Sequence, residues 1–407
     1  MREIDIIRLG QHGDGIAAGP LFAPLTLPGE RVTGKLDGQT LNEVRIVHPS
    51  PDRVSAPCRH FRSCGGCQLQ HASDTFVADW KQSIVRTALA AHGISAEFEP
   101  VHVSPPQSRR RATFAARRTK KGAMSGFHAR GSDVIIEIPE CHLLHPDVLR
   151  GSAVACDLAM AGASRKAGID VSVTLSLTGL DVAVSGGKAL DASLRVTLAD
   201  LAEKHDLARL AWGDEILVTR RPPVQMFGQA RVVPPPGAFL QATADGQSAL
   251  LARTETIIKG ARRVVDLFAG CGTFALPIAG HAQVHAVEAD SLMLEALDAS
   301  WRKTKGLRAV SVETRDLFRR PLLPDELSRF DAAVIDPPRA GADAQIAEIA
   351  GAGVPLLAYV SCNPTSFARD VKVLLESGYA MGPILVVDQF RWSTHVELVA
   401  GFTLNKK

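Results

Sequence analysis

The chain has 407 residues, of which 46% are hydrophobic and 22% are charged. This length is too great for one ordinary hydrophobic core, so we expect two or three domains. The composition is typical of globular proteins, and no apolar run is long enough to predict a membrane-spanning helix. The opening residues, MREIDIIRLG, lack the apolar core of a signal peptide. We therefore expect a soluble, cytoplasmic protein that makes no contact with membranes and acts as a monomer.

The first segment, residues 1–52, contains the short β-like runs IDIIRL, RVTGKL and EVRIV, which are interrupted by Gly and Pro. Short strands separated by such turn residues are typical of a small β-barrel. The Pro-rich stretch HPSPDRVSAP at 48–57 indicates a domain boundary. We expect a small five-stranded, OB-like barrel here.

The second segment, residues 53–232, predicts a helix near 74–91 and later strands such as DVSVTLSLTG, and we expect an α+β domain. Net charge over the whole chain is only +3, but residues 109–130 hold eight Lys or Arg and no acid. This stretch is either a solvated basic hairpin or a patch that contacts phosphates. The candidates for RNA contact are Arg109, Arg110, Arg111, Arg117 and Arg118.

Four cysteines of this segment form a second feature. Cys58, Cys64 and Cys67 have the spacing C-x5-C-G-G-C, and Cys141 follows at a distance. The chain has seven cysteines in all, and an odd number without a secretion signal argues against a disulfide framework. A structural zinc site and unrelated free thiols are both open, but three close cysteines and one remote one favour an iron–sulfur cluster with a structural role.

The third segment, residues 233–407, alternates strands and helices from VVDLFAG to TSFARDVKVLLESG. This pattern predicts βαβ units, a mostly parallel sheet and a Rossmann-like α/β fold. The last two strands, ILVVDQF and HVELVAGFTL, have no helix between them and predict an antiparallel hairpin at the edge of the sheet.

Polar residues follow each predicted parallel strand, where open α/β sheets bind their ligands. In chain order they are Asp266 to Thr273 with a G-x-G turn, Glu288, Asp316, Asp336-Pro337-Pro338, and Ser361-Cys362-Asn363-Pro364. Each alone is compatible with ordinary turn chemistry. An acid at Glu288 can bind a ribose diol, and the phosphate-binding lysine of a P-loop is missing. A nucleoside without a pyrophosphate, such as S-adenosylmethionine, fits better than ATP, while NAD stays open.

Cys362 and Glu397 are the candidates for chemistry at this edge. Most cysteines are packed core residues, but Cys362 precedes a predicted helix near Thr365, whose N-terminus can lower the pKa of a thiol. Glu397 alone is more simply an exposed strand acid, although an acid pointing into the site could act as a general base.

Five motifs together resemble the RNA uracil-C5 methyltransferases, and most closely the bacterial 23S rRNA enzymes that carry an iron–sulfur cluster. The motifs are CRHFRSCGGCQLQH from Cys58, Phe239-Leu240-Gln241, DLFAGCG from Asp266, DPPRAG from Asp336, and SCNP from Ser361. The run LGQHGDGIA from Leu9, followed by LPGE from Leu27, resembles the RNA-binding TRAM domain of these enzymes. The resemblance covers nearly the whole chain.

The resemblance implies an S-adenosylmethionine-dependent methyltransferase domain at 233–407, after a TRAM-like barrel at 1–52 and a cluster-bearing domain at 53–232. It implies that Cys362 is the nucleophile and Glu397 the base, and that Cys58, Cys64, Cys67 and Cys141 bind a 4Fe-4S cluster. The implied cofactor-site residues are Gln241, Phe268, Gly270, Thr273, Glu288, Asp316 and Asp336. Two departures stand out: Thr273 replaces a frequent Asn, and Arg391 replaces the Pro of the motif Phe-Pro-x-Thr-x-His-x-Glu.

The implied reaction is methylation of uridine C5 in RNA. The Cys362 thiolate adds to C6, C5 takes the methyl group, and Glu397 removes the C5 proton. We expect 23S rRNA as the substrate, with tRNA as the alternative. A different methyltransferase using D-P-P, in which Arg339 replaces the aromatic residue of amino-methylating enzymes, is a competing interpretation. A non-catalytic, metal-containing RNA-binding assembly factor is another.

Overall fold

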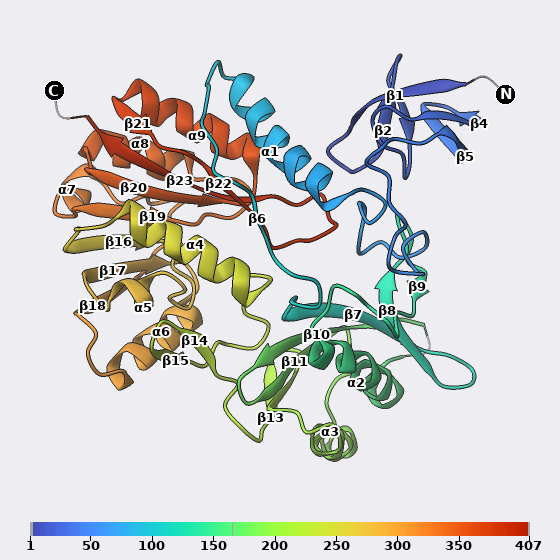
Figure 1. The fold of residues 1–407 in the computed structure, drawn as a ribbon. Coiled ribbons are helices and arrows are strands. Elements are labelled where there is room, and N and C mark those ends of the chain that lie inside the picture. Colours follow the sequence, from blue (N-terminus) through green and yellow to red (C-terminus); the bar gives the residue numbers. More distant parts are fainter. Residues whose placement is uncertain (1–2, 165, 406–407) are drawn as a thin grey trace.

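The computed structural model describes residues 3–164 and 166–405, which form three parts (Figure 1). A small barrel lies at one end, a sheet with helices on one side lies below it, and a large α/β layered unit occupies the other end. No helix in the described part of the chain is both long and apolar enough to cross a membrane.

The N-terminal part is a closed five-stranded barrel with the strand order β1-β2-β3-β5-β4. Alternating side chains such as Ile6, Val32 and Leu41 fill its interior, because successive residues of a strand face opposite sides. The predicted small β-barrel is confirmed. Its strands are β1 (Ile4–Leu9), β2 (Gly15–Ala17), β3 (Leu21–Ala23), β4 (Arg31–Asp37) and β5 (Thr40–His48).

The middle part is a seven-stranded sheet with the order β13-β12-β11-β10-β7-β8-β9 and two helices packed on it. Its strands are β7 (Arg111–Arg118), β8 (Ala123–His128), β9 (Ile135–Ile136), β10 (Ile169–Ser176), β11 (Gly179–Ser185), β12 (Arg209–Trp212) and β13 (Glu215–Thr219). The helices are α2 (Pro146–Gly162) and α3 (Ala192–Lys204). A separate hairpin, β14 (Gln225–Phe227) and β15 (Ala230–Val232), follows and packs into the core of the third part.

The third part is a nine-stranded sheet with the order β18-β17-β16-β19-β20-β23-β22-β6, in which β21 also pairs with β23. The first five strands of this order are parallel, as predicted. The strands are β6 (His102–Val103), β16 (Arg263–Leu267), β17 (Gln283–Glu288), β18 (Val310–Thr314), β19 (Ala332–Ile335), β20 (Leu356–Ser361), β21 (Tyr379–Met381), β22 (Leu385–Asp388) and β23 (Glu397–Leu404).

Helices cover both faces of this sheet, which is why its strands are apolar on both sides. On β20, Leu357 and Tyr359 belong to the core of one face, while Ala358 and Val360 belong to the core of the other. The first face carries α1 (Asp74–Ala90), α7 (Pro324–Leu327), α8 (Asp343–Ala352) and α9 (Pro364–Glu376). The second face carries α4 (Ala244–Ile257), α5 (Ala275–Ile278) and α6 (Ser291–Lys303).

Two segments lie elsewhere than their position in the sequence indicates. Helix α1 and strand β6 precede the middle sheet in the chain, yet α1 packs beside α9 and β6 pairs with β22 (Figure 1). The expected edge hairpin of the last two strands is therefore wrong in position. Strands β22 and β23 are antiparallel neighbours, but β23 inserts next to β20, and β6 covers the outer side of β22.

Candidate active site

The parallel strands place their polar end residues at one edge of the sheet. Because β16, β17, β18, β19 and β20 pair in parallel, their carboxyl ends point the same way. Glu288 ends β17, Asp336 follows β19, and Cys362 follows β20. Strand β23 runs antiparallel to β20 and pairs Leu398 with Ser361, so Glu397 begins its strand beside Cys362. The register thus brings the predicted nucleophile and the predicted base together.

Hydrogen bonds around the turn after β20 fix the position of Cys362. Asn363 caps α9 by accepting from the Thr365 backbone N–H at 3.1 Å, and its side-chain amide donates to the Arg339 carbonyl at 2.8 Å. The cysteine is half-buried and faces a cleft. This turn therefore ties the end of β20 to the segment that follows β19, where Asp336 lies.

The protonation of Cys362 differs from the expectation drawn from the sequence. The helix N-terminus led us to expect a lowered pKa, but burial and the charges of Glu397 and Asp336 raise the pKa of the Cys362 thiol to about 11. Arg339 acts in the opposite direction and does not outweigh them. In the free protein Cys362 is thus a protonated thiol near neutral pH.

The side-chain amides of Gln241 and Gln389 form a hydrogen-bonded chain between the carboxyl groups of Asp336 and Glu397. The Gln389 carbonyl oxygen accepts from the Ala242 N–H at 2.8 Å, so its NH₂ group must face the other way. That group donates to Glu397 at 3.0 Å and to the Gln241 oxygen at 2.5 Å. Gln241 in turn donates to Asp336 at 3.3 Å. Both amide orientations are therefore set by one backbone donor.

Burial keeps these carboxyls protonated to a higher pH than usual. Loss of hydration raises the pKa of both Asp336 and Glu397, and the nearby charge of Asp336 raises the pKa of Glu397 further. The hydrogen bonds from Gln241 and Gln389 lower these pKa values, but less strongly. A carboxyl whose pKa is raised in this way suits proton transfer near neutral pH.

The turn after β16 has the backbone of a ligand-binding loop. Phe268, Gly270 and Gly272 all have positive φ angles, of 63°, 54° and 91°. Such a conformation is uncommon for a residue with a side chain, and at Phe268 it indicates a functional constraint. The Gly270 N–H donates to Glu288 at 3.0 Å, and Thr273 is half-buried in the same turn.

Asp316 and an aromatic pair complete this end of the edge. Asp316 accepts from the Phe318 N–H at 3.0 Å, and the Phe318 ring lies 5.4 Å from the ring of Phe268. Phe318 is 45% exposed. We did not identify Phe318 or Gln389 from the sequence. An exposed aromatic two residues after a strand-end acid is the signal that could have indicated Phe318.

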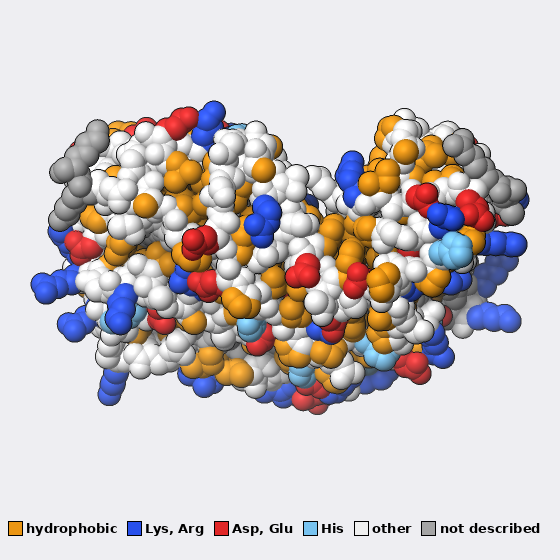
Figure 2. Space-filling model, turned by 45° about the horizontal axis from the view of Figure 1, so that its top comes forward, with side chains coloured by type: hydrophobic (Ala, Val, Ile, Leu, Met, Phe, Trp, Pro, Cys, Tyr) orange, Lys and Arg blue, Asp and Glu red, His pale blue; other side chains and the backbone are white. Residues whose placement is uncertain are grey.

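A cleft of about 1000 Å³ runs from Cys362 to the barrel. One wall is β1 and the loop after it, including Arg8 and His12, and the floor is α1. The other wall is the edge of the large sheet, with Cys362, Arg339 and His395. Figure 2 shows the molecule hollowed between the barrel and the large α/β unit. The cleft opens the thiol to a ligand far larger than a nucleoside.

The five arginines considered for RNA contact have different surroundings. Arg110 is buried and donates to the Gln241 carbonyl at 2.9 Å and to Gln247 at 2.7 Å, so it supports the amide chain from behind. Arg109 lies over the Phe390 ring, and Arg111 lies over the ring of Phe239. Only Arg117 of the five is largely exposed; Arg118 is half-buried.

The four predicted cluster cysteines are all free thiols. Among residues 3–164 and 166–405, no group of three or more His, Cys, Asp or Glu is arranged to hold a metal ion. Burial raises the pKa of Cys67 to about 12, and the nearby thiols of Cys141, Cys64 and Cys58 contribute to the same shift, so the four cysteines are close together. Backbone N–H groups of Leu143 and Leu144 hydrogen-bond to Cys141, and that of Gly66 donates to Cys64 at 3.4 Å.

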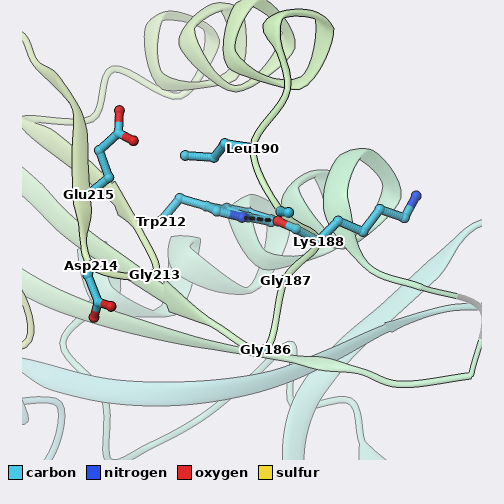
Figure 3. Close-up of a pocket in the computed structure, with 9 residues that line it drawn as sticks. Gly186, Gly187, Lys188, Leu190, Trp212, Gly213, Asp214 and Glu215 are labelled. Atoms are coloured by element: carbon cyan, nitrogen blue, oxygen red, sulfur yellow. Dashed lines mark hydrogen bonds between the residues drawn. The ribbon is translucent and has the colours of Figure 1, made fainter.

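A second pocket, of about 450 Å³, lies in the middle part of the molecule. Figure 3 shows that its charged side chains, Lys188, Asp214 and Glu215, point away from one another. The Trp212 indole N–H already donates to the Lys188 carbonyl at 2.8 Å. Nothing converges on this space, in contrast to the edge at Cys362.

Comparison with known proteins agrees with this geometry. A model described as tRNA (uracil-5-)-methyltransferase matches residues 307–407. An RNA methyltransferase of Brucella suis is 43% identical over 100% of this chain and 98% of its own length. The 23S rRNA (uracil(1939)-C(5))-methyltransferase RlmD of Chromohalobacter salexigens is 30% identical over 97% of this chain and 87% of its own length.

A solved structure shows the same fold over the whole chain. It is the tRNA (uracil-54, C5)-methyltransferase of Pyrococcus abyssi in complex with S-adenosyl-L-homocysteine, with a TM-score of 0.76 and 21% identity. The match covers 98% of this chain and 99% of that one. With the relatives above, it leads to one conclusion: this chain belongs to the RNA uracil-5-methyltransferase family, and it is an RNA methyltransferase.

Proposed function

We propose that this protein methylates C5 of a uridine in 23S rRNA, with S-adenosylmethionine as the methyl donor. The observation that carries the proposal is the β20–β23 register, which puts Glu397 beside Cys362 at the edge where the G-x-G turn and Glu288 lie. The choice of rRNA is supported by the 30% identity to RlmD over nearly the whole chain. The choice of 23S rRNA as the target rests on the similarity to RlmD, while the proposed reaction at uracil C5 rests on the arrangement of the site.

The reaction begins with the thiol. Uracil C5 is a weak nucleophile, and addition of the Cys362 sulfur to C6 converts the ring to an enolate that is electron-rich at C5. Because the pKa of Cys362 is raised to about 11, its proton must leave during the addition, and the ionised fraction of the neighbouring carboxyls can accept it. Cys362 thus forms a carbon–sulfur bond to C6.

The second stage needs a base. S-adenosylmethionine would supply the methyl group from its sulfonium. C5 of the enolate takes that methyl as the sulfur–methyl bond breaks, and S-adenosylhomocysteine leaves as the neutral thioether. C5 then carries both the methyl group and its original proton. Glu397 removes this proton, the electron pair re-forms the C5–C6 double bond, and the Cys362 sulfur leaves. Asp336 and Gln241 orient the ring, through the amide chain that also holds Glu397.

The methyl donor would lie along the carboxyl ends of β16, β17 and β18. The positive φ angles of the G-x-G turn let backbone approach a ligand closely, and Glu288 is placed to accept from a ribose diol. Phe268 and Phe318 offer an apolar surface for the adenine. The residues we assign to this site are Phe268, Gly270, Thr273, Glu288 and Asp316.

We also propose that Cys58, Cys64, Cys67 and Cys141 hold a 4Fe-4S cluster. The donor set fits, because the thiols are mutually close and three of them accept hydrogen bonds that stabilise thiolates. A cubane takes each thiolate at a separate iron, so its ligands need not converge on one point as they do for zinc. Iron and acid-labile sulfide should be present in the isolated protein and lost in Cys64→Ser, whereas one zinc without iron would contradict the assignment.

The target RNA would enter through the cleft of about 1000 Å³. A stacked uracil hides its C6, so the target base must be unpaired or flipped out to reach Cys362. The barrel wall of the cleft and the exposed arginine Arg117 are placed to contact the surrounding RNA, which is recognised mainly as single-stranded loops.

Mapping of 5-methyluridine tests the target. Ribosomal RNA and tRNA from a strain that lacks the gene are compared with RNA from the parent strain and from a strain complemented with Cys362→Ala. We expect one 5-methyluridine of 23S rRNA to disappear and to return only with the intact gene. Loss of the modification from tRNA instead would show the same chemistry on a different substrate.

A further inference from the structure

Residues 389–396, which we call the base loop, connect β22 to Glu397, the first residue of β23. The loop begins with Gln389, which hydrogen-bonds to Glu397. The position of Glu397 therefore depends on what holds this loop. Two of its contacts are with α1: the Lys81 ammonium donates to the Phe390 carbonyl at 3.2 Å, and Arg391 pairs with Asp74.

The middle of the base loop is held by the segment that carries Cys58, Cys64 and Cys67, which we call the cysteine segment. The Trp392 carbonyl accepts two backbone hydrogen bonds, from Gln68 at 2.8 Å and from Leu69 at 2.9 Å, and these residues directly follow Cys67. Trp392 has a φ of 59°, a strained conformation for a residue with a side chain. Such strain persists only where neighbouring contacts impose it, and here the two N–H donors do so.

The Trp392 ring makes the same connection through its packing. It is 7% exposed and lies in one apolar cluster with Phe61, Cys67 and Leu143, against which Cys58 and Cys141 also pack. Thus both the backbone and the ring of Trp392 rest on the segments that carry the predicted cluster ligands. The barrel adds a third contact, because a Cβ at Gly13 would lie within 3.1 Å of both Gln68 and Thr394.

We infer that Trp392 is a positioning residue that makes the placement of Glu397 depend on the state of the four cysteines. This rests on the proposed function, and it assigns the cysteine centre to one step of that reaction. When the cysteine segment is ordered by its bound group, the base loop is held and Glu397 can remove the C5 proton. When that group is lost, Cys362 still adds to uracil, but the adduct is released slowly.

The step affected can be distinguished from binding and from methyl transfer. Cys362 follows β20 and the G-x-G turn follows β16, and both strands are also held by their parallel pairing with β19. A misplaced base should therefore slow elimination of the Cys362 sulfur from the methylated ring. A displacement of about 1 Å can lower such a rate by about 10²-fold. The expected signature is a covalent protein–RNA adduct that accumulates with ordinary uridine RNA.

The test uses the full-length protein with Trp392→Leu, Trp392→Phe as the conservative variant, and Trp301→Leu as the control. Trp301 lies on α6, away from the cysteine segment. With wild-type turnover as reference, Trp392→Leu should lower turnover, accumulate the denaturation-resistant adduct and bind RNA normally. Trp392→Phe should restore most of the turnover, and Trp301→Leu should match wild type in all three measurements.

Amide hydrogen exchange provides a readout that does not depend on activity. Residues 389–397 should exchange faster in Trp392→Leu, and also in wild-type protein from which iron has been removed, while β16 and β17 stay protected. Unchanged exchange in both, or turnover that falls without adduct, would overturn the inference. If wild-type protein methylates no RNA uridine, the proposed function fails, and hydrogen exchange still decides whether the cysteines hold the base loop.

Discussion

Gln389 determines how the two buried carboxylates of the edge are arranged. Its amide is 1% exposed and fully used, since its oxygen accepts from Ala242 and its NH₂ group donates to both Glu397 and Gln241. A donor aimed at the charged form of a carboxyl favours that form. Gln389 therefore makes Glu397 a better base at neutral pH than burial alone would allow.

Changing Gln389 to Leu should shift the pH dependence of turnover. In the proposed reaction the ionised form of Glu397 is the base, so the rate of proton removal should rise with pH as that carboxyl ionises. Because the Gln389 hydrogen bond lowers the pKa of Glu397, its loss raises that pKa and moves the rise to higher pH. The shift should be about one to two pH units, since a hydrogen bond to a charged group contributes about 1.5–3 kcal/mol and one pKa unit corresponds to about 1.4 kcal/mol.

The measurement is the rate of methylation in single-turnover reactions, taken at a series of pH values from neutral to alkaline. Gln82→Leu is the control, because Gln82 donates to the Glu99 carbonyl and touches neither carboxylate. If the rise of rate with pH has the same midpoint in Gln389→Leu and in wild type, Glu397 is not the group whose ionisation limits the rate.

Individual residues differ in how well the sequence indicates them. Cys362 and Glu397 could be chosen as site residues because each lies at a strand end and matches a motif. The direction of the Cys362 pKa shift could not be predicted, because it depends on burial and on two carboxylates that are distant in sequence. Arg110 likewise belongs to a basic run, yet its partner Gln241 lies far along the chain.

Helix α1 is the element that joins the barrel side of the molecule to the methyltransferase sheet. Its Lys81 is fully buried and pairs with Asp388 at the end of β22 at 2.5 Å. The helix could be predicted from its apolar periodicity and from Ser73, which caps its N-terminus. Its place beside α9 could not, because pairing of distant elements leaves no local pattern, and the same holds for β6.

Lys81→Met should destabilise the protein strongly. Removing one member of a buried ion pair leaves the other charge unpaired, which costs about 3–5 kcal/mol. The double variant with Asp388→Leu should recover much of this loss, because no buried charge remains. Lys35→Met is the control, since Lys35 pairs with Glu43 at the surface, where the two side chains are 70% and 65% exposed.

The test is the free energy of unfolding of each variant, measured by urea titration with a signal that reports on the large α/β unit. An effect of Lys81→Met as small as that of Lys35→Met would mean that water reaches the pair. A double variant no more stable than Lys81→Met would mean that packing around α1, rather than the ion pair, dominates.

At the scale of the whole molecule, the cleft is formed by two of the three parts, because its lining residues come from the barrel and from the large α/β unit. The sheet supplies Cys362, the barrel supplies the opposite wall, and α1 forms the floor between them. The small barrel and the α/β fold follow from short strands broken by Gly and Pro and from the alternation of strands with helices. The cleft itself could not be predicted, because it exists only through the relative placement of the parts.

RNA affinity should depend on the basic end of β7. We expect the double variant Arg117→Ala, Arg118→Ala to bind its RNA more weakly and to show a smaller slope of log affinity against log salt. For phosphate contacts the slope falls by about 0.7 for each lost contact to a single strand. The double variant Arg195→Ala, Lys204→Ala on α3 removes the same charge and should keep the wild-type slope. If the slope of log affinity against log salt is equal in wild type and both double variants, the RNA does not contact Arg117 and Arg118.

The covalent complex with 5-fluorouridine RNA tests the central claim most directly. Fluorine at C5 cannot be removed as a proton, so a methylated adduct that is linked through Cys362 stays attached. With S-adenosylmethionine, wild-type protein and Glu397→Gln should both form a denaturation-resistant complex, and Cys362→Ala should form none. With ordinary uridine RNA, Glu397→Gln should retain the complex, and wild-type protein and Cys362→Ala should not. Absence of the complex in wild-type protein under conditions where it transfers methyl groups, or its persistence in Cys362→Ala, would contradict the account.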